Sequence, residues 1–119
     1  MPMSTRAVLL FGAELRWPLD EANALWSSMY GGPSGGQGLI VGMETFDGLS
    51  STYPDGTVRP FLYVEASRRS IRTEGRLPLD PIVTDPTMRR EYEETFASFC
   101  AERGITAAKP GWHMIAVYL

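Results

Sequence analysis

Residues 6–32 read RAVLLFGAELRWPLDEANALWSSMYGG and predict a strand followed by a helix. The run from Arg6 to Phe11 is short and rich in β-formers, and it is apolar on both faces, which is typical of a central strand. Pro18 and two early acidic residues then indicate the start of a helix, and apolar residues recur at helical spacing until a glycine pair ends it. We therefore expect a buried first strand and a helix over residues 19–30.

A second and longer helix is predicted over residues 86–103. Asp85 is a preferred N-cap residue, Pro86 suits the first helical position, and Gly104 can adopt the left-handed conformation that ends a helix. Its apolar face consists of Met88, Tyr92, Phe96, Phe99 and Cys100. The segment before it, residues 75–86, contains three prolines and is predicted to be a loop.

Three further strands are predicted from β-prone segments. The first covers residues 39–46, and the second covers residues 58–71, with Pro60 at its edge or start. The sequence YPDGT at residues 53–57 predicts the tip of a hairpin between them, because Pro, Asp and Gly favour successive turn positions. The last strand covers residues 112–119, and because its alternating sets are both largely apolar, we expect it to be internal.

The order of these elements predicts a single α+β domain over residues 1–119. The pattern β-α-β-β-α-β is that of a ferredoxin-like sandwich, with a four-stranded antiparallel sheet and two helices on one face. In that arrangement the first and third strands are central and the other face of the sheet is open. Because the first and last strands look the most apolar, either the strand order differs from this pattern or the open face is covered, for instance by a second subunit. We expect a homo-oligomer.

Composition excludes several classes of function. One cysteine rules out an intrachain disulfide and a cysteine-based zinc site, and one histidine rules out a His-rich metal cluster, so no cofactor is indicated. The net charge of −3 argues against binding to nucleic acid. No apolar run approaches the roughly 20 residues that a membrane span needs, and we expect a cytoplasmic protein without a membrane partner.

Four arginines fall within nine residues on and just beyond the third predicted strand: Arg68, Arg69, Arg72 and Arg76. A guanidinium binds carboxylate or phosphate groups in a fork and is a frequent anchor of protein interfaces. The alternative is a solvated strand end whose charges are neutralised by Glu65 and Glu74.

Residues 31–38 read GGPSGGQG and form a glycine-rich segment between the first helix and the second strand. Phosphate-binding loops use glycine because backbone amides must approach the anion closely, but they lead into a helix, whereas this segment leads into a strand. Gly35 and Gly36 could still hold an anionic metabolite or nucleotide together with the arginines. The alternative is a flexible connection.

His113 and Cys100 are the remaining candidates for chemistry. His113 could act as a general base if it lay near Glu44 or Glu65, which would make the protein a small enzyme, but a strand histidine without that role is the alternative. Cys100 lies on the apolar face of the second helix, so we expect it to be a core residue.

Aromatic residues at element ends, combined with arginines, are typical of interfaces. The leading interpretation is a small non-catalytic binding or inhibitory protein that engages another protein, as phage accessory or immunity proteins do. The expected contacts are Arg68, Arg69, Arg72, Trp17, Tyr53 and Tyr63. A binder of an anionic metabolite and a small enzyme that uses His113 with a carboxylate are the alternatives.

Overall fold

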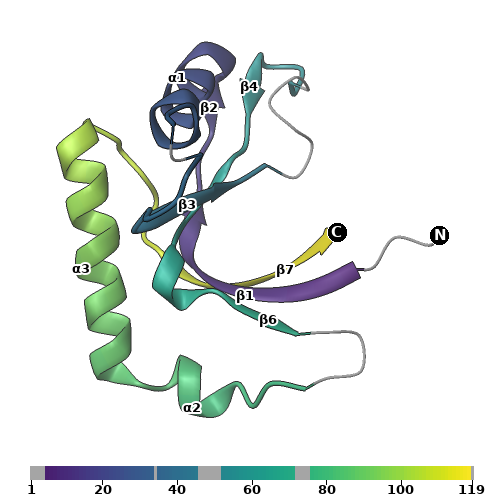
Figure 1. Ribbon diagram of the computed structural model, residues 1–119, viewed down its shortest axis with the longest axis vertical. Helices are drawn as coiled ribbons and strands as arrows, with labels where there is room; N and C mark the ends of the chain where they lie inside the picture. The colour runs from purple at the N-terminus through teal and green to yellow at the C-terminus, as the bar shows by residue number, and fades with distance from the viewer. Residues whose placement is uncertain (1–4, 34, 46–51, 72–75, 119) are drawn as a thin grey trace.

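The structure is a computed structural model that describes residues 5–33, 35–45, 52–71 and 76–118. Over these residues the chain forms a mixed α/β fold with a five-stranded sheet, a two-stranded sheet and three α-helices (Figure 1). In chain order the elements are β1 (Thr5–Glu14), β2 (Trp17–Pro18), α1 (Leu19–Tyr30), β3 (Val41–Glu44), β4 (Thr57–Val58), β5 (Phe61–Val64), the 3-10 helix η1 (Glu65–Ser67), β6 (Arg69–Ile71), α2 (Asp80–Val83), α3 (Pro86–Arg103) and β7 (Gly111–Tyr118).

β1 is the centre of the larger sheet, as its sequence predicts. It pairs with β7 from Thr5 to Gly12, and it pairs with both β5 and β6 along its other edge. β3 pairs with β5, and every pairing is antiparallel. The expectation that the last strand is internal is wrong for the described residues, because β7 pairs with β1 alone and so forms an edge of the sheet.

β1 curves sharply upward along its length (Figure 1), and Gly12 explains how β5 can follow it. A Cβ atom at Gly12 would lie 1.8 Å from the carbonyl oxygen of Leu62 and 2.7 Å from the Cα of Tyr63. Both are backbone atoms of β5, which cannot move away without breaking the pairing. Only glycine therefore allows β5 to approach β1 at this point.

We expect Gly12→Ala to lower the free energy of unfolding by about 1–3 kcal/mol or more, because the methyl group would force the two strands apart. Chemical denaturation measures the loss. The matched control is Gly111→Ala, at the position paired with Gly12 across the sheet, where a Cβ would meet no described atom within 4 Å. Equal effects of the two substitutions would show that the close contact with β5 does not matter.

The predicted strand over residues 58–71 is divided into β4, β5 and β6, which corrects the expectation of one continuous strand. η1 separates β5 from β6, so the backbone N–H of Phe11 on β1 faces η1 instead of a strand. The buried hydroxyl of Ser67 accepts a hydrogen bond from this N–H at 2.8 Å and donates to the carbonyl of Val64 at 2.6 Å. Ser67 therefore completes the edge of β1 where the strand pairing is interrupted.

Ser67→Ala should lower the free energy of unfolding by about 1–3 kcal/mol, because it leaves a buried backbone N–H without an acceptor. Urea denaturation of the two proteins measures the difference. Ser70→Ala, on the exposed surface of β6, is the matched control and should change stability little. A stability of Ser67→Ala equal to that of the control would mean that Phe11 finds another acceptor.

The helices α1 and α3 have the predicted bounds. The Asp85 carboxylate accepts hydrogen bonds from the N–H groups of Thr87 and Met88, and Gly104 has a φ of 64° in the left-handed region. The expectation that residues 75–86 form only a loop is wrong, because they contain α2. Pro81 lies in the first turn of α2, where a helix needs no N–H donor, so the proline does not prevent helix formation.

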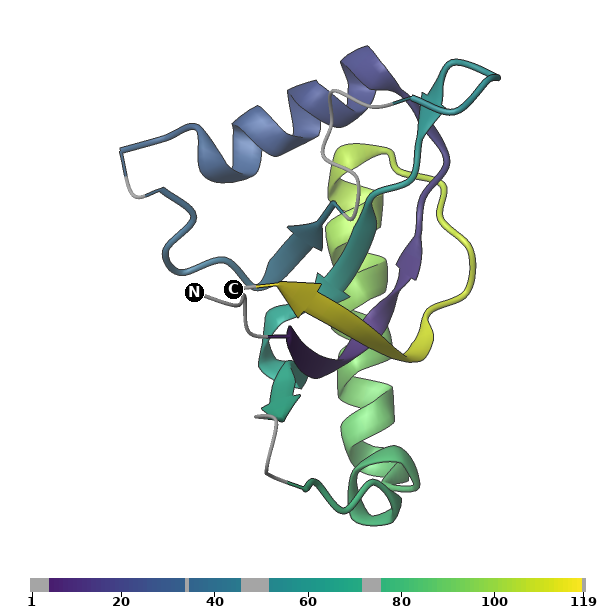
Figure 2. The same ribbon diagram turned by 90° about the vertical axis from the view of Figure 1, so that its right-hand side faces the viewer.

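Both long helices pack on the same face of the sheet, as expected, and Figure 2 shows α3 behind the sheet. Leu25 and Met29 of α1 join this core beside apolar residues of β1, β3 and β5. Tyr92, Phe96 and Cys100 of α3 join it as well, and Cys100 is only 7% exposed. The prediction that Cys100 is a core residue is therefore confirmed.

The second face of the sheet is not open at its centre, which corrects the expectation above. Val8, Leu10, Phe61 and Tyr63 form a separate buried cluster there, and each is at most 4% exposed within the single chain. The large rings provide the cover, since Tyr63 lies over Gly42 and Phe61 packs against His113. Burial of this face therefore needs no second subunit.

The predicted turn at residues 53–57 is confirmed, but the strand after it has a different partner. The N–H of Gly56 donates to the carbonyl of Tyr53. β4, which follows the turn, pairs with β2 instead of the strand predicted over residues 39–46. The reason is that the β1–β5 pairing continues into β2 and β4 through a bond from Leu15 N–H to Pro60 O at 2.8 Å.

Candidate binding surfaces

Arg68, the first of the predicted arginine contacts, is partly buried and bonded to side chains of the same chain beside β3. Its Nη1 atom donates to Glu44 Oε1 at 2.8 Å and to the hydroxyl of Tyr63 at 3.2 Å. Burial raises the pKa of Tyr63, and the nearby Glu65 carboxylate raises it further, so the phenol stays neutral. The Arg68 guanidinium is therefore held by internal partners in this structure.

Glu65 adds a second carboxylate to the Arg68 site. A Cβ at Gly42 would lie 2.5 Å from the Tyr63 hydroxyl and 2.8 Å from Glu65 Oε2, so both groups lie directly over Gly42. The ion pair with Glu44 already neutralises the Arg68 guanidinium, and the Glu65 carboxylate lies beside the Tyr63 hydroxyl. This balance disfavours an anionic ligand. The Glu44–Arg68 pair could not be predicted from local sequence patterns, because its members are 24 residues apart.

Tyr30 brings the glycine-rich segment to the edge of β3. The N–H of Met43 donates to the Tyr30 hydroxyl at 2.8 Å, and that hydroxyl lies 3.4 Å from the Met43 carbonyl. Gly36 packs against the ring, because a Cβ there would lie 2.5 Å from Tyr30 Cδ1. Tyr30 thus occupies the outward N–H and C=O groups of Met43, which protects this part of the edge from another strand.

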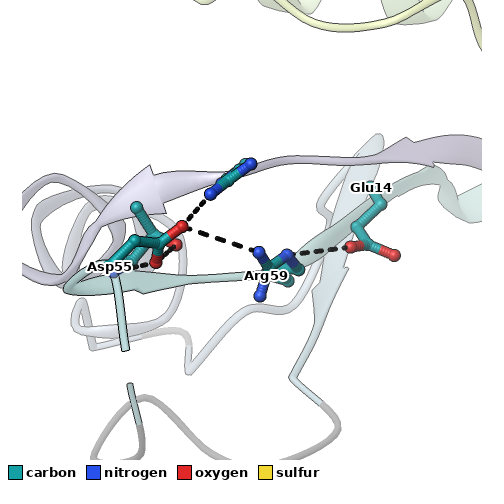
Figure 3. Close-up of polar contacts among 5 residues, drawn as sticks. Glu14, Asp55 and Arg59 are labelled. Carbon is teal, nitrogen blue, oxygen red and sulfur yellow. Dashed lines mark hydrogen bonds and ion pairs between the residues drawn. The ribbon is translucent and has the colours of Figure 1, made fainter. Parts of the chain in front are cut away.

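Ion pairs of Arg59 with Asp55 and Glu14 fix the hairpin that carries Tyr53 (Figure 3). Arg59 lies 3.7 Å from Asp55 and 3.8 Å from Glu14, and its guanidinium is 3.6 Å from the centre of the Tyr53 ring. Thr57 and Arg16 also donate to the Asp55 carboxylate and hold its pKa well below the usual range. The hairpin is therefore tied to β1 by charges that largely cancel.

The other predicted arginines do not form a common surface with Arg68. Arg69 donates to the carbonyls of Ala66 and Arg68, at 2.7 and 3.2 Å. Arg76 is exposed, and Arg72 lies outside the described residues. The described arginines do not form one shared contact surface, so a joint arginine contact stays a prediction.

The remaining predicted contacts differ in exposure. Tyr53 is 41% exposed, whereas Tyr63 is buried and Trp17 packs partly against the core. Gly35 is exposed with a φ of 59°, and Gly36 has a φ of 91°, so glycine suits both positions for backbone reasons. Of the predicted aromatic contacts, Tyr53 is the one most open to a partner.

His113 and Cys100 are not placed together with catalytic partners in the described part of the chain. His113 is exposed on β7, its ring lies 4.9 Å from that of Phe61, and it forms no ion pair with a described carboxylate. Burial raises the pKa of Cys100, which disfavours the reactive thiolate. Among the residues that the structure describes, no group of three or more His, Cys, Asp or Glu could hold a metal ion.

β7 presents an outer edge whose backbone groups can be assigned from the ladder. In an antiparallel strand the N–H and C=O of one residue point to the same side, and successive residues alternate. The N–H of Phe11 points to Ser67, on the side of β1 where β5 and β6 lie. The backbone N–H and C=O groups of Leu10 and Val8 therefore point to the opposite side, where they bond to His113 and Ile115 of β7. The N–H and C=O groups of Trp112, Met114 and Ala116 therefore point to the outside of the sheet.

The outer edge of β7 lacks the usual protection. Proteins prevent unwanted pairing of edge strands with charged residues, proline or bulges. Gly111–Tyr118 contains no proline and no Asp, Glu, Lys or Arg, and Met114 is 52% exposed. The sheet has three edge strands: β6 is only three residues long and carries Arg69, β3 has Tyr30 bonded at Met43, and β7 has no such protection among the described residues.

Comparisons with protein-family models, with curated proteins and with solved structures find no match to this chain. In the described parts of the chain, no helix combines the length and apolar character needed to cross a membrane.

Proposed function

We propose that the protein is a non-catalytic binding module that engages another protein by adding a strand of that protein to β7. The observation that carries the proposal is the unprotected outer edge of β7, in contrast to the β3 edge, which Tyr30 protects at Met43. In strand addition, main-chain hydrogen bonds supply affinity and the alternating side chains of the added strand supply specificity.

The geometry of β7 defines the partner segment. Trp112, Met114 and Ala116 can each offer one N–H and one C=O, so an extended segment of about five residues would use them all. Each backbone hydrogen bond contributes only about 0.5–1.5 kcal/mol net, so side-chain contacts must add to the affinity. The exposed Met114 side chain favours a partner with an apolar residue opposite it.

We also infer that the domain is a variant of the ferredoxin-like sandwich. The order β3, β5, β1, β7 supports this, because it places the second, third, first and fourth predicted strands side by side. The packing of α1 and α3 on one face supports it as well. β2, β4, β6 and α2 are then additions to the basic pattern. In this layout the last strand is an edge strand, which is what strand addition requires.

The test is Ala116→Pro, assayed with extended peptides selected from a random-peptide library displayed on phage. Proline removes the outward N–H of residue 116, which the pairing with β1 does not use, so the fold should survive. We expect at least about tenfold weaker binding by fluorescence anisotropy, corresponding to about 1.4 kcal/mol.

Ala116→Val is the matched control, because it keeps the N–H group and a strand-forming side chain, and it should bind like the parent protein. The melting temperature of each variant checks that the fold is retained. Undiminished peptide binding by a folded Ala116→Pro protein would refute strand addition at β7. Self-association through the same edge would appear as a dimer that Ala116→Pro dissociates, and would make a second copy the partner.

A further inference from the structure

A groove of about 550 Å³ runs along the outer face of α3, on the side of the sheet that ends with β3. One wall is a stripe of α3 residues spaced three or four apart, which includes Glu91, Glu94, Phe99 and Glu102. The facing residue is Ile40, just before β3. Because β3 and β7 are opposite edges of the sheet, this groove is separate from the edge discussed above.

The groove contains an apolar pair held in fixed positions. Ile40 is 69% exposed, yet its carbonyl accepts a hydrogen bond from Glu65 N–H at 2.8 Å, so its backbone is anchored to the sheet. Phe99 packs partly against the main core. A single exposed apolar residue is ordinary, but Ile40 and Phe99 line one recess, where an apolar side chain of a partner would bury both.

The glutamates that line the groove have fewer ion pairs with described residues than Glu93, which lies on the same helix outside the groove. Glu93, outside the groove, forms an ion pair with Arg89 at 3.0 Å. Glu91 and Glu94 form no ion pair with a described residue, and Glu102 lies 3.7 Å from Arg103. The Arg103 guanidinium also lies 4.1 Å from the centre of the Phe99 ring, so the unneutralised negative charge of the groove belongs to Glu91 and Glu94, beside the apolar Ile40 and Phe99.

We infer that this groove binds a basic amphipathic segment of another protein. An apolar side chain of that segment enters between Ile40 and Phe99, and lysine or arginine side chains face Glu91 and Glu94. These two carboxylates are one helical turn apart, with Cβ atoms about 5–6 Å from each other, so they match cations one turn apart on a partner helix. Charge complementarity of this kind selects the partner and speeds association.

The experiment uses a designed amphipathic peptide of leucine and lysine, with a glutamate-for-lysine version of the same peptide as the negative probe. Fluorescence anisotropy should detect binding of the lysine peptide at low salt, weaker binding at high salt, and none of the glutamate peptide. Glu91→Gln combined with Glu94→Gln should weaken binding about tenfold or more. Ile40→Ser should weaken it as well, since it removes the apolar contact.

Glu93→Gln is the matched control, because it removes one charge from the same helix outside the groove, and it should leave binding nearly unchanged. Equal binding by the double glutamine variant and the parent protein would overturn the inference, as would equal weakening by Glu93→Gln. Ala116→Pro should not affect this peptide, so a failure here is distinguishable from a failure of strand addition at β7. Loss of binding in Ala116→Pro would place the peptide on β7 and refute the groove.

Discussion

β1 needs hydrogen-bond partners on both edges, and the rest of the molecule is arranged around that requirement. β7 supplies one edge from Thr5 to Gly12. The other edge is shared by β5 and β6, with the Ser67 hydroxyl in the gap between them. Gly12 permits the close approach of β5, and the two long helices then cover the face that β1, β3 and β5 create.

The same arrangement leaves β3 and β7 as edges of different character. Tyr30 reaches from the end of α1 to the backbone of Met43 and protects the β3 edge there, and beside it Arg68 is held by Glu44 and the Tyr63 hydroxyl. No comparable group among the described residues covers the outer side of β7. Arg68 and Arg69, which look available in the sequence, are thus bonded within the chain, whereas the uncharged last strand is the surface that a protein partner can extend.

Local signals in the sequence were enough to predict α1 and α3 with their bounds. Asp85 and Gly104 act on neighbouring backbone groups, so their effect can be read without the rest of the fold. Contacts between residues far apart in the sequence could not be predicted from such local signals. The apolar residues on both faces of β7 predict that both faces are buried, but they do not show how many strands pair with β7. The role of Ser67 depends on its hydrogen bond with Phe11, 56 residues away in the sequence. For the same reason the sequence named Glu44 as a partner of His113 rather than of Arg68, and it did not reveal the bonds of Tyr30 to Met43 or the ion pairs of Arg59.

Amide hydrogen exchange along β7, followed residue by residue by NMR, tests the central claim that this edge is open. An open edge predicts alternation: the amides of His113 and Ile115, bonded to β1, exchange slowly, and those of Met114 and Ala116 exchange close to the rate of an unprotected chain. Protection of Met114 and Ala116 equal to that of their neighbours in the isolated protein would contradict it, because the outer edge of β7 would then already be covered.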